Sequence, residues 1–305
     1  MMEIKNMIDC TRKVVVIGTV FMDIKGYPEG DFNPVGRNVG RIEYKYGGVA
    51  RNVADDLAGL GLRPFFVSMI DEDGPGGAIL DHLNEAGVNT EYVLRRPDCI
   101  GTWMVILNPQ GDVCANLSRR QDLLPLHEVL ERQGDEIFRN ADGVLLEMDV
   151  EERIVEDVFR LAQKYQTKVY GVISNINIAL ERMPYIRRTG CFICNRQEAG
   201  VMFGQDTGNL PAQDLLQLLK KGMSETGIPA MVITMDKDGA VYAGCEEEGY
   251  CEAEQVTVVD STGAGDAFFA GVSAGLISSV PLSQACRIGT GMAAAVIQSR
   301  ENVYR

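Results

Sequence analysis

The residues best placed to do chemistry lie near the C-terminus, where residues 260–266 read Asp-Ser-Thr-Gly-Ala-Gly-Asp. The β-branched run Val256–Val259 just before them predicts a short strand that leaves a sheet. Ser261 and Thr262 are good N-cap residues for a helix that begins at Ala264. The sequence therefore predicts a strand, a tight glycine turn and a helix.

A turn built from Gly263, Ala264 and Gly265 carries no bulky side chain, so it leaves the first backbone N–H groups of the helix open. Open amides at the positive end of a helix dipole form an anion site. Asp266 lies beside this site, where a carboxylate can take the proton from a hydroxyl that attacks a phosphoryl group. The alternative is an ordinary glycine turn with an acid that stabilises the helix dipole.

The longer string through Gly271 resembles the C-terminal signature of the ribokinase-like (PfkB) carbohydrate and nucleoside kinases. The resemblance to this family as a whole extends over nearly the entire chain. It implies that Asp266 is the catalytic base and that Gly263, Ala264 and Gly265 hold the transferring phosphoryl group. It also implies an ATP-dependent kinase.

The composition restricts the class of protein. The 305 residues are 46% hydrophobic and carry a net charge of −14, which disfavours nucleic acid or an anionic membrane surface as a partner. No apolar run is long enough to span a bilayer, and the N-terminus does not read as a secretory signal. Eight cysteines in a large acidic chain suit a cytoplasmic enzyme with reduced thiols. We expect Cys191 and Cys194, despite their spacing, to be buried structural residues.

The N-terminal region carries a second group of candidate residues. Asp23 follows an apolar run typical of a central parallel strand, and ligands collect at the carboxyl ends of such strands. A double glycine, Gly47-Gly48, precedes a helix that contains Asn52. These residues resemble the N-terminal signature of the PfkB family, which implies that Asp23, Gly47, Gly48 and Asn52 bind the acceptor. Without the resemblance they are a capping acid, a turn and a polar helix residue.

The order of elements predicts one α/β domain over 1–305, with a doubly wound, mostly parallel sheet flanked by helices. Residues 41–46 alternate between polar and apolar side chains, and residues 102–117 predict a β-hairpin. Neither segment belongs to the succession of parallel strands and helices. With neighbouring residues they predict a small β-sheet lid, discontinuous in sequence, from about 23–46 and 99–118. The resemblance implies that the lid closes over the sugar and forms a homodimer contact.

The nucleotide site is predicted mainly from the resemblance. Asn195 and Glu198 follow a strand and match the family's Asn-x-x-Glu, which implies that Glu198 helps to hold Mg²⁺ through water. Thr234 and Gly239 match a segment that lies along ATP, although Asp236 stands where many relatives have glycine. Asp260 and Thr262 match positions that bind a monovalent cation, which suggests K⁺.

The sequence as a whole predicts a kinase that phosphorylates a primary hydroxyl of a sugar or nucleoside, with ATP and Mg²⁺. The stretch from Val14 to Asn52 resembles pseudouridine kinases and related nucleoside kinases, which favours pseudouridine or a related nucleoside as the acceptor. A ribokinase- or fructokinase-type sugar kinase is the alternative. A sugar-sensing binding protein without catalytic activity is the alternative from another class.

Overall fold

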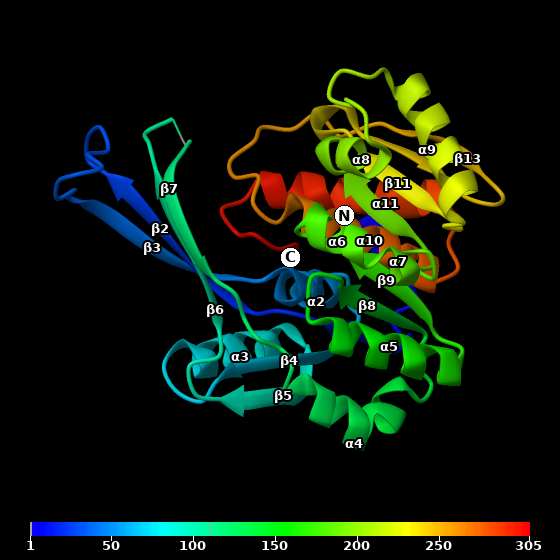
Figure 1. The fold of residues 1–305 in the computed structure, drawn as a ribbon, viewed down its shortest axis with the longest axis horizontal. Coiled ribbons are helices and arrows are strands. Elements are labelled where there is room, and N and C mark those ends of the chain that lie inside the picture. Colours follow the sequence, from blue (N-terminus) through cyan, green and yellow to red (C-terminus); the bar gives the residue numbers. More distant parts are fainter. Residues whose placement is uncertain (1, 111) are drawn as a thin grey trace.

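A computed structural model describes residues 2–110 and 112–305. Its main feature is a nine-stranded sheet in the order β13-β12-β11-β10-β9-β8-β1-β4-β5 (Figure 1). The first strands in the chain are β1 (Val14–Ile17), β4 (Phe65–Asp71), β5 (Asn89–Arg96), β8 (Gly143–Glu147) and β9 (Lys168–Val172). The later ones are β10 (Phe192–Asn195), β11 (Met231–Thr234), β12 (Ala240–Ala243) and β13 (Glu248–Cys251). Among the described strands of this sheet the pairings are parallel except β11 with β12 and β12 with β13, so the predicted mostly parallel sheet is confirmed.

Helices cover both faces of this sheet. Along β1 successive side chains point to opposite faces, so Val14 and Val16 join one core cluster and Val15 and Ile17 join the other. The first cluster packs under α2 (Val49–Gly59), α3 (Pro75–Ala86), α10 (Ala264–Ile277) and α11 (Leu282–Ile297). The second packs under α4 (Leu126–Phe138), α5 (Glu152–Tyr165), α8 (Arg196–Phe203) and α9 (Ala212–Thr226). Short helical segments are α1 (Met2–Lys5), α6 (Ile176–Glu181), α7 (Met183–Ile186) and a 3₁₀ turn at Asp236–Asp238.

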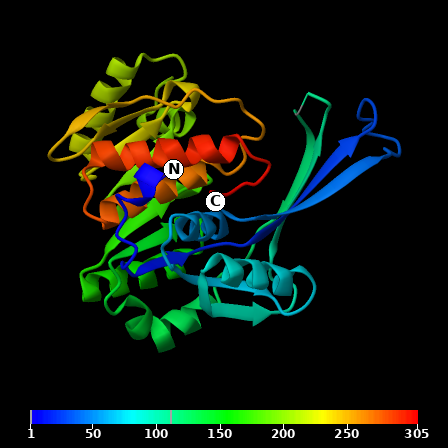
Figure 2. The same ribbon diagram turned by 180° about the vertical axis from the view of Figure 1, so that it is seen from behind.

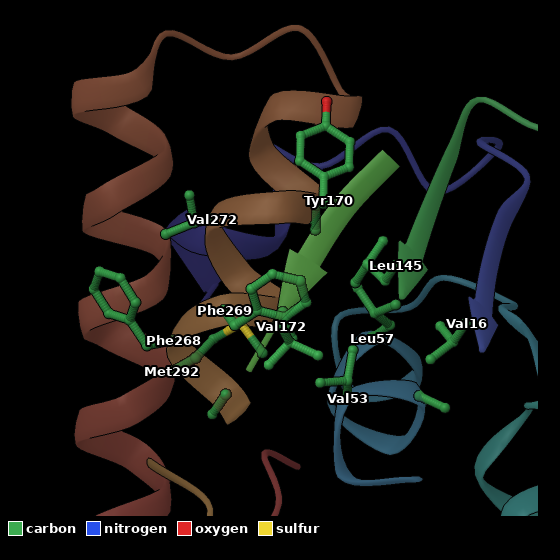
Figure 3. Close-up of a cluster of buried hydrophobic side chains, with 14 of the residues drawn as sticks. Val16, Val53, Leu57, Leu145, Tyr170, Val172, Phe268, Phe269, Val272 and Met292 are labelled. Atoms are coloured by element: carbon green, nitrogen blue, oxygen red, sulfur yellow. The ribbon is translucent and has the colours of Figure 1, made fainter. Parts of the chain in front are cut away.

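The first core cluster fixes α2 beside α10. Figure 3 shows Phe269 of α10 and Val53 and Leu57 of α2 on the same side of the central strands. These side chains pack against Val16, Leu145 and Val172, and the exposed fraction of each is below a tenth. Apolar burial of this kind stabilises the fold by roughly 1.5–3 kcal/mol for each large side chain. The two helices that carry Asn52 and Asp266 are thus held side by side.

A second sheet of four strands extends away from the main body, as both ribbon views show (Figures 1 and 2). Its order is β3-β2-β6-β7, formed by β2 (Phe21–Pro28), β3 (Gly40–Gly47), β6 (Gly101–Leu107) and β7 (Val113–Arg119). The strands come from the two separate segments that the sequence predicted for a small sheet. That the sheet closes as a lid remains a prediction.

One predicted strand is wrong. Residues Val256–Val259 are not in a strand, and Val258 and Val259 are more than half exposed. The amide of Val259 donates to the carbonyl of Ile297 at 2.7 Å, so the segment is tied to the end of α11 instead of to a sheet edge. A β-branched run forms a strand only where a neighbouring strand offers backbone partners.

Within the described ranges no helix is long and apolar enough to cross a membrane.

Cys191 and Cys194 are buried, free thiols, as expected, and burial raises the pKa of Cys191 to about 12. This high pKa keeps the thiol neutral and unreactive.

Candidate active site

The turn before α10 leaves backbone amide groups open at the start of the helix. Gly263 is the N-cap residue with φ 84°, in the left-handed region that favours glycine, and no side chain caps the helix. The prediction that Ser261 or Thr262 caps this helix is therefore wrong: the Ala264 amide donates instead to the Ser261 carbonyl. Over the part of the chain that the structure describes, the amides of Gly263, Gly265 and Asp266 have no hydrogen-bond partner. These three N–H groups can receive an anion.

The carboxylate of Asp266 lies at this helix N-terminus and contacts α2. Asn52 Nδ2 donates to Asp266 Oδ2 at 2.6 Å, although the two residues are 214 positions apart. Burial raises the pKa of Asp266 to about 6, which the bond from Asn52 and the charge of Arg51 oppose and the charge of Asp23 reinforces. A carboxylate with a pKa near 6 is a stronger base than an ordinary aspartate and is still ionised at neutral pH.

The double glycine before α2 is required by close contacts. Gly48 has φ 96°, and a Cβ there would lie 2.5 Å from the carbonyl oxygen of Thr19. A Cβ on Gly47 would lie 2.6 Å from a carboxylate oxygen of Asp23. The backbone can therefore pass over Asp23 at residue 47, and over the carbonyl of Thr19 at residue 48, only without side chains.

Asn52 is held by its neighbour in α2 and by a residue near the C-terminus. Its Oδ1 accepts from the fully buried guanidinium of Arg51 and from Asn302 Nδ2 at 3.3 Å. Asn302 Nδ2 also donates to the carbonyl of Tyr46 at 2.8 Å. With Oδ1 used as an acceptor, the amide orientation is set and Nδ2 faces Asp266.

Asp23 lies on β2 with its side chain buried against residues 47–48. Burial raises its pKa, while the nearby positive charges of Lys25, Arg51 and Lys45 oppose the rise. Because Gly47 lies against the Asp23 carboxylate and Asn52 bonds to Asp266, the structure brings the acceptor-binding candidates and the candidate base to one place.

A second group of polar residues lies where the parallel strands of the main sheet end. Glu147 ends β8, Asn195 ends β10 and Thr234 ends β11. Asn195 and Glu198 form a capping box: Asn195 Oδ1 accepts from the Glu198 amide at 2.9 Å, and Glu198 Oε2 accepts from the Asn195 amide at 2.8 Å. Their spacing thus also has a purely structural use at the start of α8.

Glu147 and Asp149 are candidate site residues that the sequence did not indicate. Glu147 accepts from the backbone N–H and the hydroxyl of Thr19, both at 2.8 Å. Burial raises the pKa of Glu147 to about 7; the bonds from Thr19 oppose this, and the charges of Asp149 and Asp266 add to it. Neither acid belongs to a recognisable local spacing, so only the fold reveals that Glu147 lies near both Asp149 and Asp266.

These carboxylates fit a magnesium ion that shares its ligands with phosphate and water. Oδ1 of Asp149 is buried and has no partner within residues 2–110 and 112–305, whereas Oδ2 accepts from the amides of Ser174 and Asn175. Burial raises the pKa of Glu198, and the charge of Asp149 adds to it. In the described part of the chain, no group of three or more acidic, histidine or cysteine side chains is arranged to hold a metal ion without other ligands. Mg²⁺ commonly keeps several waters and binds through one or two carboxylates.

The loop after β11 follows the predicted nucleotide segment. Gly239 has φ 89°, and a Cβ there would lie 2.0 Å from the carbonyl of Cys251. Asp236 has φ 50° and is exposed, so this acid occupies a left-handed position that glycine also suits. The adjacent cavity of about 460 Å³, lined by Arg196, Met235 and Asp238 among others, does not include Asp266 or Asn52.

Comparison with known proteins shows similarity along most of the chain. A profile of the pfkB family of carbohydrate kinases matches residues 11–303. Guanosine-inosine kinase of Exiguobacterium acetylicum is 32% identical over 294 residues, which cover 95% of this chain and 96% of that enzyme. Pseudouridine kinase of Escherichia coli (strain K12) is 23% identical over 284 residues, which cover 91% and 88% of the two chains.

The fold is also that of solved ribokinases. The structure of Arabidopsis thaliana ribokinase complexed with ribose and ATP matches with a TM-score of 0.83 at 21% identity, over 95% of this chain and 93% of that one. Such a likeness shows the ribokinase-like fold, and the family profile and the 32% identical relative show the family. The chain therefore belongs to the pfkB family of carbohydrate kinases and is a phosphotransferase that acts on a hydroxyl group of a sugar or nucleoside.

Proposed function

We propose that this enzyme transfers the γ-phosphoryl group of ATP to the primary hydroxyl of a nucleoside. The observation that carries the proposal is the contact of Asn52 with Asp266 beside the open amides at the start of α10. The contact puts a base, an anion site and an acceptor-binding helix together. The similarity to a guanosine-inosine kinase over 95% of the chain supports a nucleoside as the acceptor.

In the proposed reaction the acceptor hydroxyl bonds to the γ-phosphorus, its proton passes to Asp266, and ADP leaves. Asn52 holds Asp266 Oδ2, and the described residues make no hydrogen bond to Oδ1, which is therefore available to accept the proton. The amides of Gly263, Gly265 and Asp266 stabilise the charge on the phosphoryl oxygens. The Ala264 amide, which we also expected to contribute, is already used by Ser261.

The residues proposed for the acceptor are Asp23, Gly47, Gly48 and Asn52. Asp23 accepts hydrogen bonds from sugar hydroxyls, and the glycines let the sugar approach the backbone. Closure of the small sheet excludes water, so that ATP is not simply hydrolysed. The base of the nucleoside must be recognised elsewhere, because these four residues contact only the sugar in this arrangement.

For the nucleotide we propose Asn195, Thr234 and Gly239 as contacts, with Glu198, Asp149 and Glu147 as the carboxylates that hold Mg²⁺, mostly through water. When bound, Mg²⁺ neutralises charge on the β- and γ-phosphates. We do not extend the proposal to a monovalent cation at Asp260 and Thr262, because two lysine ammonium groups already lie beside that carboxylate.

The identity of the acceptor nucleoside is a separate proposal. We propose guanosine and inosine first, because the guanosine-inosine kinase is more similar to this chain than the pseudouridine kinase. The sequence analysis had favoured pseudouridine. Pseudouridine is the second candidate. Ribose and fructose are the sugar alternatives.

The test measures ADP release with guanosine, inosine, pseudouridine, uridine, adenosine, ribose and fructose. We expect the highest kcat/KM with a purine nucleoside, and a loss of roughly 10²–10⁴ in kcat for Asp266→Asn. Near-normal turnover of Asp266→Asn would show that another group is the base. Tight acceptor binding without ADP formation would favour the sugar-sensing protein instead.

We propose that the enzyme works in the cytoplasm. All eight cysteines are free, which suits a reducing compartment.

We also propose a homodimer through the small sheet, whose outward face carries exposed apolar side chains such as Tyr44 and Leu117.

A further inference from the structure

Two lysines of the small sheet point toward the helix that carries Asp266. Lys25 lies two residues after Asp23 on β2, and Lys45 of β3 pairs with Asp23 across the ladder. Since side chains alternate along a strand, Asp23, Lys25 and Lys45 share one face of the sheet. This face is turned to the main body: Asp23 contacts residue 47, and both lysines reach Asp260.

The two ammonium groups end in the loop that precedes α10. Lys25 Nζ lies 3.2 Å from Thr262 Oγ1 and 3.5 Å from Asp260 Oδ2, and its side chain is 6% exposed. Lys45 Nζ also lies 3.5 Å from Asp260 Oδ2, and it donates to the backbone carbonyl of Arg300 at 2.5 Å. Lys45 thus joins β3, residues 260–262 and the C-terminal segment at one point.

Two of these residues, Asp260 and Thr262, are those that the sequence predicted to bind a monovalent cation. Such a site is formed by a carboxylate and carbonyl oxygens, and here Asp260 Oδ2 and the Arg300 carbonyl already have an ammonium nitrogen within 3.5 Å. A free K⁺ at this carboxylate would lie close to two positive charges and would be repelled. The residues present therefore do not fit a free monovalent cation beside Asp260.

The loop that the lysines hold leads directly into the anion site. Thr262 precedes Gly263, and the carbonyl of Asn302 lies so close to Gly263 that a Cβ there would be 2.0 Å away. Asn302 in turn contacts Asn52. A change in the position of residues 260–262 or 300–302 would therefore move the amides at the start of α10.

We propose that Lys45, with Lys25, replaces the free monovalent cation, so that tethered ammonium groups hold the anion site in shape. Both are positioning residues, because they act through Asp260, Thr262 and Arg300. Since the lysines belong to the small sheet, its position also decides whether this charge is in place. The link to turnover rests on the proposed kinase function, but the link to ion binding does not.

The lowered pKa of Asp260 agrees with the ion pairs to Lys25 and Lys45. Burial by itself would raise the pKa of Asp260, but hydrogen bonds from Thr262 and the charges of Lys25 and Lys45 outweigh it, and its pKa lies below the ordinary value. The carboxylate thus stays ionised without an added cation.

The first test compares K⁺ with tetramethylammonium, which cannot enter a small oxygen-lined site, at equal ionic strength and with Na⁺ excluded. We expect the wild-type kcat and melting temperature to be the same in both salts. In Lys45→Ala we expect kcat in tetramethylammonium to fall roughly tenfold, and K⁺ or methylammonium to restore much of it. Lys164→Ala, which removes a surface pair with Asp135, should behave as wild type in both salts.

A second test does not depend on turnover. Thallium(I), a substitute for K⁺ that is visible by NMR, should show no bound signal with wild-type protein and a bound signal with Lys45→Ala. A wild-type enzyme that needs K⁺ or binds thallium(I), or a Lys45→Ala variant that retains full activity in tetramethylammonium, would overturn the proposal. If no acceptor gives turnover, the proposed function fails, while the thallium and melting measurements still decide this inference.

Discussion

At the scale of single residues, we propose that the pKa of Asp266 sets the pH range of activity. Burial raises that pKa to about 6, and the proposed base works only when ionised. We therefore expect kcat/KM to fall as the pH drops through about 6. Because the bond from Asn52 lowers the pKa of Asp266, Asn52→Leu should move this fall to higher pH, in addition to weakening acceptor binding. The measurement is the pH profile of kcat/KM.

The exposed Asn177 of α6 provides the control for that profile. Asn177→Leu should leave both the acid limb and its height unchanged. An acid limb at the same pH in wild type and Asn52→Leu would mean that Asp266 is not the group that titrates.

The buried Glu147 makes a prediction about stability. Its folded-state pKa of about 7 lies above its ordinary value of 4.5, so the native state binds this proton more tightly than the unfolded chain. The stabilisation is fully present below pH 4.5 and is lost as the pH rises through 7. Glu147→Gln, which can still accept from Thr19, should therefore raise the free energy of unfolding at pH 8 by at most about 3 kcal/mol, with little change at pH 4.5.

Urea unfolding without Mg²⁺ at several pH values would test this. Glu225→Gln is the control, since Glu225 forms only an exposed pair with Lys221 and should show no such pH dependence. A destabilised Glu147→Gln at pH 8 would contradict a net cost of burying the Glu147 charge.

At the scale of elements, the turn before α10 depends on one glycine more than on the other. Gly263 has φ 84° and lies against the Asn302 carbonyl, whereas, apart from the helix's own backbone and the two chain neighbours, no described residue lies within 4 Å of a Cβ on Gly265. We expect Gly263→Ala to destabilise the protein by about 1–3 kcal/mol through backbone strain, before any cost of moving the C-terminal segment. Gly265→Ala should be neutral or slightly stabilising, because alanine favours a helix. Urea unfolding of the two variants, side by side, gives the comparison.

Equal stability of Gly263→Ala and wild type would mean that the loop adopts another backbone conformation without cost. It would also weaken the idea that residues 300–302 fix the shape of the anion site.

Elements with a local signal could be predicted from the sequence. The β1 run, the hairpin at 102–117 and the helix after Gly48 follow from burial pattern, alternation and glycine placement. The strand expected at Val256–Val259 does not form, because strand formation depends on a neighbour that no local pattern reveals. β2 was expected only as part of the small sheet from about residue 23, without bounds of its own, since its proline and glycine hide the alternation.

The site shows the same division. Asp23, Asn52 and Asp266 could be named because each belongs to a recognisable string, and the fold brings them together. Glu147, Lys25 and Lys45 could not, because each is a single charged residue whose role depends on a partner more than a hundred positions away. Long-range packing alone creates those pairs.

At the scale of the whole molecule, the small sheet has two different faces. One carries Asp23, Lys25 and Lys45 toward the active site. On the other, Tyr44, Met104 and Leu117 lie in a row across neighbouring strands, since Ile24 pairs with both Tyr44 and Met104, and Met104 pairs with Leu117. Tyr44 and Leu117 are 68% and 71% exposed, which is unusual for apolar residues that lie together.

This row predicts that a second copy of the chain packs on the small sheet. We expect the wild type to sediment as a dimer and Leu117→Asp to sediment as a folded monomer, because a charge buried in an apolar contact without a partner is costly. Val201→Asp, at an exposed position on α8 of the main body, should remain a dimer. Since the same sheet holds Asp23 and Lys45, the monomer should also have a raised KM for the acceptor. A wild-type monomer at assay concentration, or a Leu117→Asp dimer, would place the contact elsewhere or remove it.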